Sequence, residues 1–191
     1  AARDAARAQM KSDCAGQTEI SNHGGLDIIS DPGVLPEDKD KVTDALDKAK
    51  DAEKKDLDDI TIDDDIGRPF EWTDANGMVH TGSVAGYYSG DDITIHNGGT
   101  SDKTEETVKH EVGHHDYEKR LTQEGVTKWD EFWNAGDNKK TVRNGGKMPS
   151  DYAGRNADEG FAECYARLRC DGILDPITKA KIEEVLRMLN P

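Results

Sequence analysis

The chain has 191 residues, the length of one ordinary domain, with 40 acidic and 25 basic side chains and a formal net charge of −15. This charge argues against nucleic acid and anionic membrane surfaces as partners, because both bind proteins through clustered Lys and Arg. No run of about 18 apolar residues occurs, so membrane insertion is not expected either.

Residues 1–34 are predicted to form a lead-in segment ahead of one domain over residues 35–191. Four glycines and two prolines surround a single apolar run in 14–36, so we expect this stretch to be loosely structured. Residues 1–13 have no apolar centre and are not predicted to be a signal peptide. The missing initiator Met favours a processed chain, or part of a larger exported or particle-associated protein.

The sequence predicts one helix, then a group of strands, then further helices. The first helix begins with Pro36 at its first position and runs to about Lys55, with Val42, Leu46 and Ala49 at helical spacing. Short strands are expected at 59–63, 70–73, 78–81, 87–88 and 93–95. Further helices are expected at about 104–121, 156–170 and 176–189. A small sheet followed by helices predicts the α+β class.

An HExxH motif, His110-Glu111-Val112-Gly113-His114, lies inside the helix predicted over 104–121. Residues four apart leave a helix on the same side, one turn apart, so both imidazoles can reach one Zn²⁺ ion. Glu111 lies about 100° around the helix from His110. It can therefore take a proton from a water on the zinc without binding the ion itself.

The alternative is a helix whose two histidines are surface or packed residues without a metal. Gly113 bears on this choice, because glycine inside a helix costs about 1 kcal/mol relative to alanine. Its presence predicts that the sheet or a second helix approaches closely at this point.

A catalytic zinc site needs a third protein ligand and one open position. Candidates follow on a second helix, in the pattern Tyr152-Ala, then Asn156, then Glu159-Gly-Phe-Ala-Glu163. This pattern resembles the third-ligand helix of gluzincin-type zincin metallopeptidases, namely the anthrax lethal factor catalytic domain and the Pro-Pro endopeptidases. In those proteins the ligand Glu lies seven residues after a Tyr that assists in the transition state. The resemblance therefore implies Glu159 as third zinc ligand and Tyr152 as the phenol that steadies the oxyanion.

The two motifs span residues 107–170, about a third of the chain. The resemblance implies a zincin-like domain, in which a small mixed sheet packs on the HExxH helix and a helical part follows. It also implies a zinc metalloendopeptidase with a peptide or protein substrate. Gly160 departs from the family, which usually has a bulky residue there, and this leaves the packing of the second helix open.

Several of these residues have alternative interpretations. Asn156 and Glu159 also fit a purely structural capping box. Glu163 lies one turn beyond Glu159 and could compete as a ligand, although we expect it to hold a ligating His by its second nitrogen. Tyr152 could be a core aromatic residue. Cys164 could bind metal, but a small buried thiol is the commoner case.

Three cysteines cannot all pair within the chain. On one helix Cys164 and Cys170 would lie about 9 Å apart, too far for a disulfide. A bridge is therefore expected only from Cys14 to one of these two.

The strand before the HExxH helix is a candidate substrate-binding segment. In zincins an edge strand in that place pairs with the extended substrate through backbone hydrogen bonds. By this analogy we expect substrate to contact Ile93, Thr94, Ile95, His96 and Asn97.

Three hypotheses follow from the sequence. The first is a zinc metalloendopeptidase, and the second is the same chemistry in a toxin or effector domain of a larger protein. The third is a catalytically inactive, zinc-stabilised binding or particle-structural domain. The presence of Glu111 argues against the third, because a structural metal site has no use for a base. The oligomeric state is left open.

Overall fold

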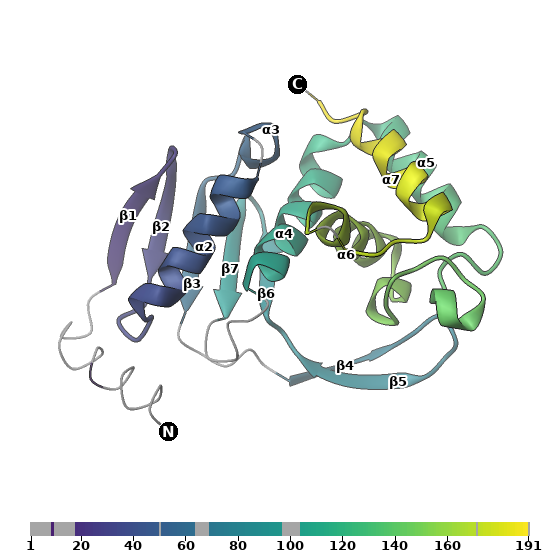
Figure 1. Cartoon of the computed structure of the whole chain (residues 1–191), viewed down its shortest axis with the longest axis horizontal. Helices are drawn as coiled ribbons and strands as arrows, with labels where there is room; N and C mark the ends of the chain where they lie inside the picture. Colours follow the sequence, from purple (N-terminus) through teal and green to yellow (C-terminus); the bar gives the residue numbers. More distant parts are fainter. Residues whose placement is uncertain are drawn as a thin grey trace. The chain divides into compact units, whose positions relative to one another are not determined.

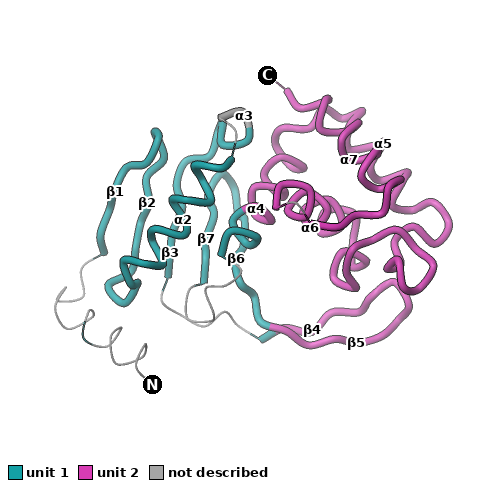
Figure 2. Tube along the Cα trace, viewed as in Figure 1, with its two compact units in different colours: residues 1–69, 83–108 teal, residues 70–82, 109–191 magenta. Residues whose placement is uncertain are grey.

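A computed structural model describes residues 9, 18–49, 51–63, 69–96, 104–170 and 172–190. Small sheets and several helices make up these residues, which confirms the predicted α+β class (Figure 1). The chain divides into two compact units, one of residues 1–69 and 83–108 and the other of residues 70–82 and 109–191 (Figure 2). Within the described residues, no helix is both long enough and apolar enough to cross a membrane.

The first unit is built on a five-stranded sheet with the order β1-β2-β3-β7-β6. Its strands are β1 (Glu19–His23), β2 (Leu26–Ser30), β3 (Asp59–Asp63), β6 (Gly86–Ser89) and β7 (Asp92–His96). The pairs β2–β3 and β3–β7 are parallel, whereas β1–β2 and β6–β7 are antiparallel. The sheet is therefore mixed, as predicted.

The core of the first unit lies between this sheet and the helix α2 (Pro36–Lys48). Val42 and Leu46 of α2 are fully buried, as are Ile60 and Ile62 of β3. The helix predicted to run on to Lys55 instead ends at Lys48, because Ala49 is extended, and the short helix α3 (Asp51–Lys54) follows.

The prediction of a loosely structured lead-in is wrong for residues 19–30. They form the hairpin β1–β2, and β2 pairs with β3 inside the sheet, so this stretch belongs to the first unit. Gly24 and Gly25 have φ values of +62° and +98°, which a tight turn needs and which glycine adopts freely. The glycines therefore mark a hairpin turn and not a loose segment.

β7 lies between β3 and β6 and is hydrogen-bonded on both sides. An edge strand binds an extended peptide through unpaired backbone groups, and β7 has already used these groups within the sheet. The predicted substrate contact through an edge strand is therefore wrong for Ile93, Thr94, Ile95 and His96. Asn97 lies outside the described residues.

The second unit combines a two-stranded sheet with a group of helices. These elements are β4 (Pro69–Thr73), β5 (Val79–Ser83), the C-terminal part of α4 (Thr104–His115), α5 (Gln123–Asn134), α6 (Ala157–Arg169) and α7 (Pro176–Leu186). α4 continues into a π-helical turn at Asp116–Arg120. The core of the second unit contains three fully buried aromatic residues, Trp129, Phe161 and Tyr165.

The helix α5 is absent from the sequence predictions. Its signals are nevertheless present: the Thr122 side chain caps the helix by accepting a hydrogen bond from the backbone N–H of Gly125. Val126, Trp129 and Trp133 follow at spacings of three and four, and the two tryptophans are buried.

Candidate metal centre

Two imidazoles from α4 and one carboxylate from α6 converge in the second unit. The Nε2 atoms of His110 and His114 lie 3.1 Å apart. Glu159 places Oε2 at 3.2 Å from Nε2 of His110 and at 3.3 Å from Nε2 of His114. The three residues predicted as metal ligands are thus brought together, and their side chains are only 10–13% exposed. This group could hold a metal ion.

The carboxylate of Glu159 influences the protonation of both imidazoles. Burial lowers the pKa of His114, but hydrogen bonds to Asp158 and Glu159 outweigh it and raise the pKa to about 10. For His110, burial likewise lowers the pKa, and the Glu159 hydrogen bond and the Glu111 charge raise it overall. Burial raises the pKa of Glu159, but its hydrogen bonds to both imidazoles hold it well below the usual range. The ionised carboxylate of Glu159 therefore favours protonation of both imidazoles. A metal ion would compete with these protons for the ring nitrogens.

Each imidazole has a carboxylate on the side opposite Glu159. Asp158 places Oδ1 at 2.6 Å from Nδ1 of His114, which is a short, charge-assisted hydrogen bond. Glu163 places Oε1 at 3.6 Å from Nδ1 of His110, which is beyond hydrogen-bonding distance. Among the described residues that Nδ1 atom is buried without a hydrogen-bond partner. Glu163 is therefore in the predicted place, but the predicted hydrogen bond is absent.

Glu163 is instead held by Ser150, whose hydroxyl donates to its Oε2 at 2.9 Å. The same hydroxyl oxygen accepts a hydrogen bond from the backbone N–H of Ala153 at 3.0 Å. Ser150 thus connects the loop before α6 to Glu163, the carboxylate that lies beside His110.

The second oxygen of Glu159 faces two donors. The Tyr152 hydroxyl donates to Oε1 at 2.7 Å, and Nη1 of Arg155 donates to the same Oε1 at 2.9 Å. Nη1 of Arg155 also donates to the Tyr152 hydroxyl oxygen at 3.2 Å. Burial and the charge of Glu159 raise the pKa of Tyr152. Tyr152 is thus more than a core aromatic residue, because its polar end contacts a candidate ligand.

Glu111, the predicted base, is almost completely buried at 4% exposure. Burial raises the pKa of its carboxyl, while the charges of His110 and His114 oppose that rise. The motif therefore places a fourth carboxyl near the imidazoles, and Glu111 is not a member of the group of three that could hold a metal.

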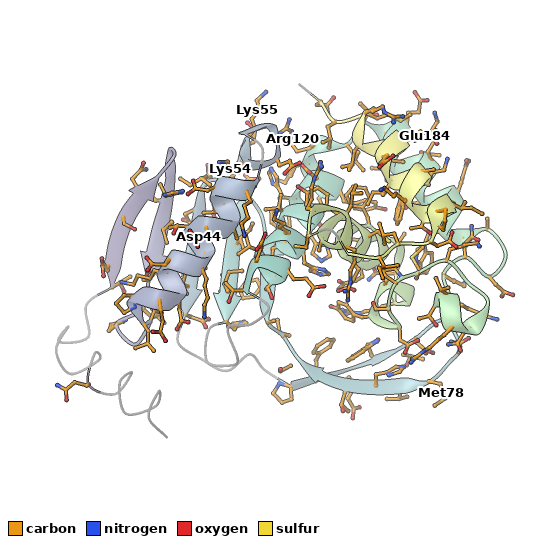
Figure 3. The ribbon with its side chains drawn as sticks, in the orientation of Figure 1. Asp44, Lys54, Lys55, Met78, Arg120 and Glu184 are labelled. Atoms are coloured by element: carbon orange, nitrogen blue, oxygen red, sulfur yellow. The ribbon has the colours of Figure 1, made fainter. Side chains whose placement is uncertain are left out.

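The β4–β5 hairpin supports Tyr152. The Tyr152 ring meets Phe70 and Trp72 edge-on, with centroids 5.9 and 5.3 Å apart. The Arg155 guanidinium lies over Phe70 at 5.7 Å. Met78, labelled in Figure 3, lies at the turn of this hairpin and is 62% exposed. Phe70 and Trp72 of β4, and not the turn, therefore contact Tyr152.

Two glycines explain how close the helices come. A Cβ atom at Gly113 would lie 2.8 Å from Cα of Ala162. The predicted close approach is therefore confirmed, and of the two predicted neighbours, the sheet or a second helix, it is the helix α6. A Cβ atom at Gly160 would lie 2.7 Å from the ring of Trp133. Trp133 of α5 thus occupies the space that a bulky residue at position 160 would fill.

The contacts at the N-terminus of α6 exclude a purely structural capping box as the role of Glu159. Asn156 caps the helix, and its Oδ1 accepts a hydrogen bond from the backbone N–H of Glu159 at 2.7 Å. A full capping box would return the Glu159 carboxylate to the cap residue. Here that carboxylate instead contacts His110 and His114.

Among the described residues, neither Cys164 nor Cys170 belongs to the group that could hold a metal. Cys164 is completely buried and burial raises the pKa of its thiol, so it behaves as a small apolar residue. Cys164 and Cys170 form no disulfide with each other, as predicted. Cys14 lies outside the described residues.

A second group of titratable side chains lies at the hairpin. The imidazole Nε2 of His80 lies 3.1 Å from Oδ2 of Asp74, and Asp151 is close to both. Burial raises the pKa of Asp74, but its hydrogen bonds, above all to His80, lower it to about 2. Arg143 forms a salt bridge with Asp151. A cationic side chain thus already occupies one side of this group.

No protein-family model matches the chain, and no curated protein matches its sequence. A fold alone does not specify a function, so the function is inferred from the side chains of the centre.

Proposed function

We propose that the protein is a zinc-dependent metalloendopeptidase with a zincin-like fold of the gluzincin type. His110, His114 and Glu159 would hold the zinc ion, and peptides or proteins would be the substrate. One observation carries this proposal, namely the triangle of two imidazole nitrogens and one carboxylate oxygen with sides of 3.1, 3.2 and 3.3 Å.

The sides of the triangle are within about 0.3 Å of the ligand spacing in a zinc tetrahedron. Zinc bonds of about 2.0–2.1 Å place tetrahedral ligand atoms about 3.3–3.4 Å apart. Two His and one Glu form a donor set of catalytic zinc enzymes, which leave the fourth corner free. Imidazole nitrogen suits zinc better than it suits magnesium or calcium, which prefer oxygen ligands.

Zinc bound here would polarise the substrate carbonyl and lower the pKa of a coordinated water to about 7. Glu111 would accept a proton from the attacking water while the oxygen of that water bonds to the carbonyl carbon of the substrate. Glu111 would then pass that proton to the amide nitrogen as the C–N bond breaks. Burial supports this role, because a carboxyl with a raised pKa exchanges protons nearer to neutral pH.

Tyr152 would donate a hydrogen bond to the oxyanion that develops on the carbonyl oxygen. Its hydroxyl already lies within 2.7 Å of Glu159 and is held at the edge of the ligand triangle. The hydroxyl would turn from Glu159 to the substrate during the reaction.

The order of elements supports the zincin-like fold. A mixed sheet precedes α4, which carries the two histidines, and α6 supplies the third ligand from the C-terminal helices. The same site would serve an isolated enzyme or a toxin or effector domain of a larger protein.

The proposal is tested by metal analysis together with a peptide-library digest, with and without a chelator. We expect one equivalent of zinc and cleavage that the chelator abolishes. Glu111→Gln is expected to keep the zinc and lose the cleavage. Glu131→Gln, on the exposed side of α5, is the matched control and should change neither. Zinc without cleavage in the unaltered chain would instead support the zinc-stabilised binding domain.

A further inference from the structure

Arg155, which the sequence motifs do not single out, contacts both Tyr152 and Glu159. We infer that Arg155 is a positioning residue, which keeps Oε1 of Glu159 hydrogen-bonded so that Tyr152 can leave this oxygen for the substrate. This inference rests on the proposed function and adds to it a residue outside the HExxH and Glu-x-Phe-Ala-Glu motifs.

The two oxygens of Glu159 have separate surroundings. Oε2 lies 3.2 and 3.3 Å from the two imidazole nitrogens, whereas Oε1 accepts hydrogen bonds from Tyr152 and Arg155. A carboxylate can bind a metal through one oxygen or through both, and two-oxygen binding would add a fifth ligand atom beside the two imidazoles, Oε2 and the solvent ligand. Donors on Oε1 therefore favour binding through Oε2 alone.

A tyrosine hydroxyl has a single hydrogen to donate. Tyr152 cannot hold Oε1 of Glu159 and stabilise a substrate oxyanion at the same time. When its hydroxyl turns to the substrate, a largely buried carboxylate oxygen loses one of its two donors. Arg155 remains as the second donor and carries a charge, so Oε1 stays hydrogen-bonded throughout.

Arg155 is placed to keep this contact. Its guanidinium lies over the rings of Phe70 at 5.7 Å and Tyr152 at 5.8 Å. It lies four residues before Glu159, and its side chain is 40% exposed, against 10% for Glu159. The aromatic residues of the hairpin thus orient a charged donor that reaches the ligand from the solvent side.

The first test reads the coordination of the metal and needs no substrate. Cobalt(II) replaces zinc, and its visible absorption distinguishes four-coordinate from five-coordinate sites. We expect a four-coordinate spectrum for the unaltered chain and for Tyr152→Phe, in which Arg155 still holds Oε1. The double variant Tyr152→Phe/Arg155→Met frees Oε1 and is expected to show a five-coordinate spectrum. Replacing Arg155 by Lys in the Tyr152→Phe background should restore the four-coordinate spectrum.

The second test is kinetic and uses the best peptide from the library. Arg155→Met alone should lower kcat about tenfold, within the range for outer partners of metal ligands, and leave KM within about twofold. Tyr152→Phe should then lower kcat by a smaller factor in the Arg155→Met variant than in the unaltered chain, because the two donors act together. Arg187→Met, an exposed arginine after α7, is the control and should change neither constant.

The outcomes separate this inference from the proposed function. If the unaltered chain binds neither cobalt nor zinc, the proposed function fails and the inference fails with it. If it binds the metal, but the double variant keeps the spectrum of Tyr152→Phe, only the role of Arg155 is overturned. That role is likewise overturned if Arg155→Met cleaves the peptide with the kcat of Arg187→Met.

Discussion

Asp158 holds His114 through a 2.6 Å contact between Oδ1 and the ring nitrogen Nδ1. The contact fixes the ring so that Nε2 faces Glu159, and a carboxylate in this position also makes the imidazole a stronger ligand. Asp158 and Glu159 are neighbours on α6, so one turn of this helix both orients a histidine and supplies a ligand.

Asp158→Asn is therefore predicted to weaken zinc binding about 10–100-fold, because the amide keeps the size of the side chain but loses its charge. Competition with a chromophoric chelator measures this change. Asp137→Asn, an exposed residue after α5, should leave the affinity unchanged. Equal affinities for the two variants would show that Asp158 does not support the centre.

Gly113→Ala is predicted to destabilise the protein by about 1–3 kcal/mol through overpacking, although alanine favours a helix by about 1 kcal/mol. The added Cβ would lie 2.8 Å from Cα of Ala162, a backbone atom. Urea unfolding measures the loss. Adding Ala162→Gly should recover little of it, because the clash with the Cα atom remains. Full recovery would mean that only the Ala162 side chain limits the approach of the two helices.

Gly160→Ala is predicted to be destabilising for a different reason, since its Cβ would meet the Trp133 ring at 2.7 Å. Trp133 also donates a hydrogen bond from Nε1 to the backbone carbonyl of Ala153 at 3.0 Å. Phenylalanine lacks the five-membered ring that the added Cβ would meet. The double variant Gly160→Ala/Trp133→Phe should therefore lose less stability than the sum of the losses in the two single variants. Additive losses in thermal unfolding would contradict this packing.

Metal removal is predicted to lower the midpoint of thermal unfolding. Zinc that binds only the folded protein raises the free energy of unfolding by about 2.7 kcal/mol when the free zinc concentration is 100 times the dissociation constant. Glu111→Gln should show the same shift between zinc and chelator as the unaltered chain, because Glu111 is not a ligand. Glu159→Gln should show a much smaller shift. A reduced shift in Glu111→Gln would place Glu111 among the ligands.

The parts of the site that follow local spacing were predictable from the sequence. Four residues make one helical turn, so His110 and His114 had to lie on one side of α4. The cost of Gly113 inside a helix likewise pointed to a close neighbour, which proved to be Ala162. Glu159 needed more, because only the resemblance to a known motif connected it with the histidines.

Contacts that depend on the arrangement of distant segments were not predictable. Asp158 and Arg155 have ordinary positions at the start of a helix, and their partners are known only once α4 and α6 are placed together. The position of β7 is a similar case. Its alternation predicts a strand, but only the strand order shows that β7 has neighbours on both sides.

The proposed zinc centre is tested most directly by X-ray absorption at the zinc edge of the purified, unaltered chain, together with its metal content. We predict one zinc per chain with two imidazole nitrogens, one carboxylate oxygen and a fourth ligand from solvent. Replacing Glu159 by Gln should weaken the binding of the ion and change the oxygen contribution. Failure to bind zinc, or a fourth ligand from a protein side chain such as a thiolate, would contradict the proposed peptidase.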